Sequence, residues 1–124
     1  MFNQTPEKIY LTETAQLLSH DLEVDLHTNQ QAWEQLRDAL IVFLDNLIRT
    51  DSNRLYYYLY RIDVSEKRIK QTLADTPNQT LTAPLLADLI LERTLEKVKT
   101  RLAYKQWQET QNPTNNHNEQ ADEW

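Results

Sequence analysis

The densest group of side chains able to do chemistry lies between His20 and His27. In these eight residues two imidazoles, three carboxylates and three apolar side chains follow one another as His-Asp-Leu-Glu-Val-Asp-Leu-His. In an extended backbone, the three carboxylates and His27 lie on one face, with the apolar side chains opposite. Carboxylates and imidazoles suit a divalent metal, so one interpretation is a metal-dependent enzyme. The other is a solvated acidic linker over an apolar groove, because the spacing matches no established metal-binding motif. We favour the linker and predict no metal or other cofactor.

No nucleophile, base and orienting group can be combined elsewhere in the chain. Ser65 and Asp63 are close in sequence, but a helix cap and its flanking residue explain both. The chain has no cysteine, which excludes a thiolate nucleophile or thiolate metal site. We therefore predict no catalytic or cofactor-binding residues and no enzymatic activity.

The absence of glycine restricts the fold and the ligands. None of the 124 residues is glycine, whereas average usage is about 7%. Phosphate-binding loops and dinucleotide-binding turns require glycine, and tight hairpins favour it. Helices are affected least, because asparagine can also end a helix. The composition therefore favours an all-α fold.

Helical periodicity and capping residues divide the chain into five candidate helices. Ser65 is the expected N-cap of the fourth helix, and Pro84 lies in the first turn of the last, where proline is tolerated. Between the first two helices, alternating residues 22–26 predict an extended or helical linker. We predict an all-α four- or five-helix bundle over residues 5–109. The expected helices are 12–22, 29–49, 54–62, 66–75 and 82–108.

Residues 110–124 are rich in Asn, Gln, Thr and acids, a composition typical of a disordered tail. The tail ends in Asp122, Glu123 and Trp124. In layout it resembles the acidic tails of bacterial single-stranded DNA-binding proteins, which recruit partners, although those tails end differently. Three interpretations stay open: a passive terminus, a docking peptide, or a segment that folds back on the basic residues of the last helix.

Neither end of the chain nor its apolar runs indicate a membrane protein. The longest apolar run, 39–44, is far shorter than the roughly 20 residues of a membrane-spanning helix. The N-terminal residues lack the basic and apolar regions of a targeting segment. We expect a cytoplasmic protein.

The tyrosines of residues 56–60 and the net charge both argue against a nucleic-acid partner. Tyr58 is expected in the core, while Tyr56 and Tyr60 lie on another side of their helix, so the tyrosines do not form one stacking platform. The sequence pI is about 5.0, the reverse of the basic character expected of a nucleic-acid-binding domain.

Charge is distributed unevenly along the chain. Residues 1–53 contain three basic and nine acidic residues, whereas residues 54–107 contain ten basic and six acidic residues. Two helices carry a stripe of like charges. The basic stripe, on the last helix, is Arg93, Lys97, Arg101 and Lys105, and the acidic stripe, on helix 29–49, is Glu34, Asp38 and Asp45. These two stripes either face each other inside one bundle or remain solvated, or they meet across an interface.

The last helix is apolar on two nearly opposite sides. One side can enter the core, and the other needs a second cover. We predict a homodimer through this second side, with the neighbouring basic residues contacting acids of the other copy. The predicted interface consists of Leu91, Leu95, Val98 and Leu102, with Arg93, Lys97 and Arg101 facing Glu34, Asp38 and Asp45.

These observations favour a non-enzymatic protein–protein interaction or regulatory module whose partner the sequence does not identify. The alternative is a small acidic inhibitor or immunity-type protein that mimics nucleic acid with Glu34, Asp38 and Asp45. A metal-dependent enzyme built on residues 20–27 is the third and least favoured possibility.

Overall fold

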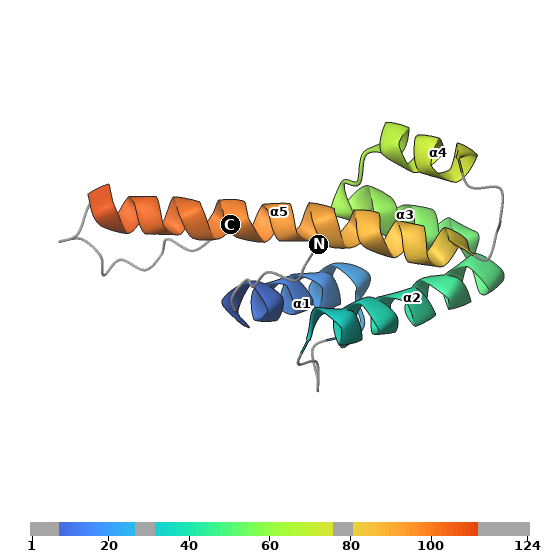
Figure 1. Ribbon diagram of the computed structural model, residues 1–124, viewed down its shortest axis with the longest axis horizontal. Helices are drawn as coiled ribbons and strands as arrows, with labels where there is room; N and C mark the ends of the chain where they lie inside the picture. Colours follow the sequence, from blue (N-terminus) through green and yellow to red (C-terminus); the bar gives the residue numbers. More distant parts are fainter. Residues whose placement is uncertain (1–7, 27–31, 76–80, 112–124) are drawn as a thin grey trace.

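The computed structural model describes residues 8–26, 32–75 and 81–111. These residues form five α-helices and no strand (Figure 1). The all-α bundle predicted from the sequence is confirmed. The helices are α1 (Lys8–Leu22), α2 (Trp33–Thr50), α3 (Ser52–Ile62), α4 (Glu66–Ala74) and α5 (Thr82–Gln111).

The long helix α5 organises the bundle, because each of the other four helices packs against it. In Figure 1, α1 and α2 lie along one side of α5, and α4 lies at the outside of the molecule. Helix α3 also contacts α1 and α2, so the centre of the domain lies between these four helices. Helix α4 has no buried residue.

Side-chain caps fix two of the helix boundaries. The backbone N–H of Asp51 bonds to the Leu47 carbonyl at the end of α2, and its carboxylate accepts from the N–H of Arg54 at 3.1 Å. One residue therefore ends α2 and starts α3. The hydroxyl of Ser65 accepts from the N–H of Arg68 at 3.2 Å at the start of α4, which confirms the predicted cap.

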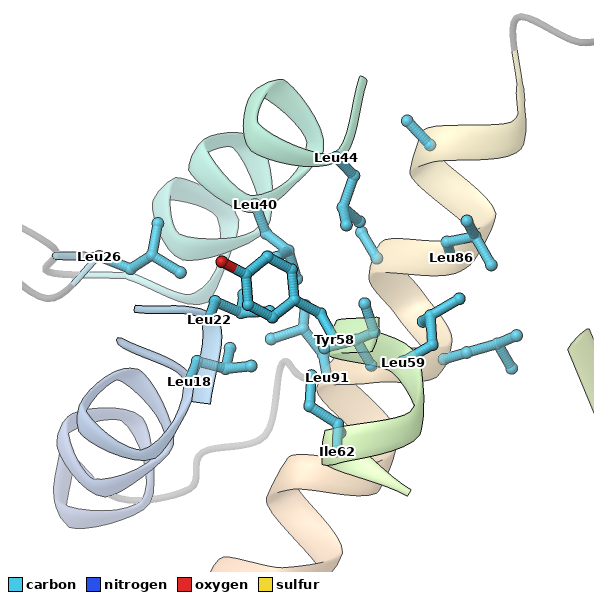
Figure 2. Close-up of a cluster of buried hydrophobic side chains, with 14 of the residues drawn as sticks. Leu18, Leu22, Leu26, Leu40, Leu44, Tyr58, Leu59, Ile62, Leu86 and Leu91 are labelled. Atoms are coloured by element: carbon cyan, nitrogen blue, oxygen red, sulfur yellow. The ribbon is translucent and has the colours of Figure 1, made fainter. Parts of the chain in front are cut away.

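The core is built mainly from leucine (Figure 2). Tyr58 is buried in it, as the sequence predicts, while Tyr56 and Tyr60 are exposed. The aliphatic residues have well-defined rotamers and pack to high density without polar partners. Among the fully buried side chains are Leu18, Leu22, Leu36, Leu40, Leu44, Ile62, Ile90 and Leu91.

The segment after α1, predicted to be an extended or helical linker, begins with a turn at Glu23. Asp21 and Leu22 still belong to α1, and Glu23 then takes a left-handed conformation with φ 57°. Leu22 and Leu26 are buried while Glu23 and Asp25 are exposed. The alternation of apolar and acidic residues is therefore right for burial, but the helix removes Asp21 from the predicted acidic face.

Three helices are longer than predicted: α1 begins at Lys8, α3 begins at Ser52 and α5 continues to Gln111. Residues 110 and 111 are therefore helical. Helix α2 begins at Trp33, later than the predicted residue 29. The rest of the predicted tail, including Trp124, lies outside the described residues. Of the helices described, none combines the length and the apolar character needed to cross a membrane.

Candidate functional site

The apolar stripe predicted to bind a second copy is largely part of the chain's own core. Leu91 is 0% exposed and Val98 is 3% exposed, whereas Leu95 and Leu102 are half-buried. The cause is that all four other helices pack against α5. Of the four residues of this stripe, only Leu95 and Leu102 therefore retain exposed surface.

Two residues of the basic stripe bind the end of α3. Arg93 donates to the Asp63 carbonyl at 3.0 Å and to the Asp63 carboxylate at 3.1 Å, and it also pairs with Glu96. Lys97 Nζ donates to the carbonyl of Ile62. The last carbonyls of a helix lack intrahelical donors and attract cations. Arg93 and Lys97 therefore hold α3 against α5 rather than projecting toward a partner.

Partial burial changes the acid–base behaviour of Lys97. Burial lowers the pKa of its ammonium, and the repulsion of Arg93 and Arg101 adds to this effect. The carboxylates of Asp21 and Asp63 act in the opposite direction. A lysine in this position favours the neutral form more than a solvated one does.

His20 and Asp21, the first two residues of the segment that suggested chemistry, line a groove between α1 and α5. His20 Nδ1 lies 3.2 Å from the Asp21 carboxylate, and Arg101 lies across from them on α5. In the three described ranges, no three His, Asp or Glu side chains are grouped as metal ligands; His27 lies outside these ranges. The described lining contains no hydroxyl or amine nucleophile. It consists of Glu13, Gln16, Leu17, His20, Asp21, Val98, Arg101 and Leu102.

A cluster centred on Glu23 was not predicted from the sequence. Its carboxylate accepts from Arg54 at 3.1 Å, from the Tyr58 hydroxyl at 3.3 Å and from Arg61 at 3.2 Å. The Arg54 guanidinium also lies 5.4 Å from the centre of the Tyr58 ring. The hydrogen bond that Arg54 Nε donates to the Tyr58 hydroxyl, at 3.1 Å, raises the pKa of Arg54. Glu23 is at least 31 positions from these partners, so no local pattern indicates the contact.

The acidic stripe of α2 is on the surface. Glu34 and Asp38 are exposed and form no ion pair with another described residue, whereas Asp45 pairs with Arg49 at 2.8 Å. Ile41 and Val42 lie at helical spacing between these acids, and Val42 is 70% exposed. We call these five residues, Glu34, Asp38, Ile41, Val42 and Asp45, the acidic α2 face.

An open groove of about 820 Å³ adjoins the acidic α2 face. Ile41, Val42 and Asp45 belong to its lining, which is otherwise mainly apolar. The other lining residues are Val24, Leu26, Ala39, Phe43, Asn46, Arg49, Ala83 and Pro84. The surface therefore combines carboxylates at the edge with an apolar hollow.

The last turns of α5 carry two exposed aromatic rings. Tyr104 and Trp107 are 50% and 55% exposed, and their rings stack at 5.8 Å between centres. Gln108 donates to the Tyr104 hydroxyl at 3.3 Å. We call residues 99–111 the C-terminal arm. Lys99, Arg101 and Leu102 at its start lie beside α1, and Figure 1 shows the C-terminal end of α5 extending beyond the other helices. The sequence indicates this pair only in that Tyr104 and Trp107 follow Leu102, the last residue of the predicted apolar stripe.

Comparison with family models, with curated proteins and with solved structures finds no match for this chain.

Proposed function

We propose that the protein is a non-enzymatic protein–protein interaction module and that the C-terminal arm is its main contact surface. The observation that carries the proposal is the exposed Tyr104–Trp107 pair on a helix that continues past the bundle. Tryptophan and tyrosine are enriched at interfaces and contribute strongly when they become buried.

The helical form of the arm supports the same function. Peptide helices commonly bind by laying one face into a groove of the partner. The arm presents Tyr104 and Trp107 at a spacing of three residues, which places them on adjacent parts of the helix surface.

The whole chain is free of cysteine, which fits a reducing compartment, and we propose that the protein acts in the cytoplasm.

A nucleic-acid mimic is the second candidate, and one observation favours it. Glu34 and Asp38 are exposed without an ion pair to another described residue, as a mimic of backbone phosphates requires. Asp45, the third acid, is already paired with Arg49. Two exposed carboxylates beside exposed Val42 suit a mixed apolar and charged contact better than a phosphate-like surface.

Site-specific photo-crosslinking in the cell tests the proposal. A photo-reactive amino acid at position 107 should give discrete protein adducts, and the same amino acid at position 60 should not. Tyr60 is the matched control, because it is an aromatic residue on α3 and is 87% exposed. The absence of adducts at 107 above those at 60 would contradict the module. Adducts of a nuclease or polymerase at position 38, with none at 107, would favour the mimic.

A further inference from the structure

One side of α2 joins carboxylates to apolar surface. Successive residues of an α-helix lie about 100° apart around its axis, and on this scale the acidic α2 face covers only about 100° of the circumference. Within that sector Val42 is 70% exposed and Ile41 is half-buried. The leucines that α2 buries, among them Leu36 and Leu40, lie on the far side of the helix. One partner surface can therefore contact the carboxylates and the apolar side chains together without disturbing the core.

The acidic α2 face keeps an excess of negative charge. Of the two arginines of α2, Arg37 donates to Asp88 on α5 at 2.7 Å, and Arg49 pairs with Asp45 at 2.8 Å. The other two carboxylates of the face form no ion pair with another described residue. A surface of one sign attracts partners of the opposite sign and repels those of the same sign. Nucleic acids and anionic lipid surfaces are therefore repelled here, and a cationic partner is attracted.

The chain offers no undescribed segment of its own that suits this face. Residues 1–7, 27–31, 76–80 and 112–124 contain no lysine or arginine. The same face of a second copy would bring like charges together, which costs binding free energy. The charges therefore favour a cationic segment of another protein as the occupant.

The groove beside the face supplies the apolar half of the contact. It has a volume of about 820 Å³, and its lining includes Ala39 and Phe43 on α2 and Pro84 at the start of α5. Asp45 and Arg49, which pair with each other, are the charged residues of the described lining. A mainly apolar hollow of this kind favours a bulky apolar side chain over a polar one.

We propose that the acidic α2 face binds a cationic amphipathic helix of another protein. The apolar side of that helix lies on Val42 and the groove, while its lysines or arginines contact Glu34 and Asp38. Figure 1 shows α2 apart from the projecting C-terminal end of α5. The contact therefore adds a second surface to the one named in the proposed function and does not depend on it.

The spacing of the acids sets the spacing of the partner's cations. Glu34 and Asp38 are one turn apart, and Asp45 follows about two turns later, so the face is roughly 17 Å long. A helix of about three turns that packs along α2 covers this length. Its cations should repeat the intervals of four and seven residues between the acids, with an apolar pair inside the longer interval.

A designed peptide of this pattern tests the surface directly. The probe is an alanine-based helix whose three lysines and two leucines repeat the spacing of the three acids and of Ile41 and Val42. The control peptide has the same composition, with the lysines moved to the side away from the leucines. On the full chain, the probe should shift the NMR amide signals of α2 and bind roughly fivefold more tightly than the control. Unshifted α2 signals at about 1 mM peptide, or equal binding of both peptides, overturn the inference.

Neutralising the two exposed acids isolates the electrostatic part of the contact. E34Q/D38N should weaken binding of the probe by roughly three- to tenfold at low salt. The difference should shrink at high salt, because screening removes the same attraction from the wild type. The control E66Q/D75N removes two exposed acids from α4 and its end and should bind as the wild type does. An equal loss in both variants would place the probe elsewhere and overturn the inference.

A substitution at Val42 isolates the apolar part. Val42→Ser removes exposed apolar surface without touching the core, and it should weaken the probe several-fold at both low and high salt. Tyr60→Ser removes an 87% exposed side chain from α3 and is the control. If Val42→Ser binds as tightly as the wild type, the groove does not take part and the proposed contact is wrong.

Crosslinking in the cell identifies the natural occupant. A photo-reactive amino acid at position 42, with position 60 as the control, should capture a protein whose crosslinked peptide carries lysines or arginines at helical spacing beside apolar residues. Adducts of twice the 14.8 kDa chain mass, a captured peptide without these cations, or no adducts above position 60 would each contradict the proposal. Position 107 is read separately. Adducts at 107 with none at 42 overturn this contact while the interaction module stands, and the reverse result supports this contact and contradicts the role of the arm.

Discussion

Arg37 on α2 donates to both carboxylate oxygens of Asp88 on α5, at 2.7 Å from Nε and 3.2 Å from Nη2. The hydrogen bond and the charge of Asp88 raise the pKa of Arg37. This bidentate pair connects the two helices. Its basic residue lies on α2, which carries the acidic stripe, and its acidic residue lies on α5, which carries the basic stripe.

Removing the charge of Asp88 should destabilise the fold measurably. Asp88→Asn keeps the side-chain size but leaves a weaker, neutral acceptor for Arg37. Because both side chains are about one-third exposed, we expect a loss of roughly 0.5–1.5 kcal/mol of unfolding free energy. Urea unfolding measures it. Asp45→Asn is the control, since it breaks an exposed pair within one helix, and a loss as large as that of Asp88→Asn would contradict the role given to the interhelical pair.

The lowered pKa of Lys97 should appear in the pH dependence of stability. Burial makes the folded state hold this proton less tightly than the unfolded chain. Between the lowered pKa and the ordinary lysine value of about 10.4, the unfolded state binds more protons, so unfolding free energy rises with pH. The stability of the wild type relative to Lys97→Met should increase through this range and then level off.

Lys97→Arg controls the assignment, because its guanidinium keeps its charge over the same range. The unfolding free energy of the wild type should rise relative to that of Lys97→Arg over the same pH range. A constant difference between wild type and both variants from neutral pH to above 10.4 would show that Lys97 is not the titrating group.

Two buried threonines should be better replaced by valine. The hydroxyls of Thr14 and Thr94 are fully buried and have no hydrogen-bond partner among the described residues. An unsatisfied buried hydroxyl costs about 1–3 kcal/mol, and valine has the same branched shape without it. Thr14→Val and Thr94→Val should each raise the melting temperature. The exposed residues Thr12 and Thr100 are the controls; equal gains there would mean that burial is not the cause.

At position 23, where the backbone is left-handed, we expect glycine to be more stabilising than alanine, which is the reverse of their order inside a helix. Glu23→Gly and Glu23→Ala both remove the carboxylate that Arg54 and Arg61 contact, but only glycine adopts φ 57° without a steric cost. Glycine should therefore be more stable than alanine by about 1 kcal/mol at this position.

At Glu96 in the interior of α5 the order should be the opposite, with alanine favoured over glycine by about 1 kcal/mol. Both sets of variants are compared by urea unfolding. If alanine is the more stable residue at position 23 as well, the left-handed conformation is not retained in solution.

The helices could be predicted because their determinants are local. Ser65 and Asp51 cap helices through backbone groups three residues away, and leucine periodicity marks the buried side of α2. The positions of the charged stripes could not be predicted in the same way. Whether Arg93 points to solvent or to Asp63 depends on how two helices pack, and these residues are 30 positions apart.

The candidate surfaces were found only in part. The acidic residues of α2 were identified from the sequence, but their apolar neighbour Val42 was not, since one exposed valine is indistinguishable in sequence from a buried one. Leu91 and Val98 were assigned to an interface because the sequence does not show that the other helices of the chain bury them against α5.

The uneven packing along α5 divides the helix into two regions whose backbone amides should exchange hydrogen at different rates. Its 30 residues span roughly 45 Å, and the core is packed only against the part up to Val98. Amide hydrogens in that part should exchange with solvent only when the whole domain unfolds, whereas those of the C-terminal arm should exchange through local fraying. A partner that binds the arm would slow this local exchange as the partner's concentration increases, so a single helix would report both the stability of the domain and the occupancy of its interface.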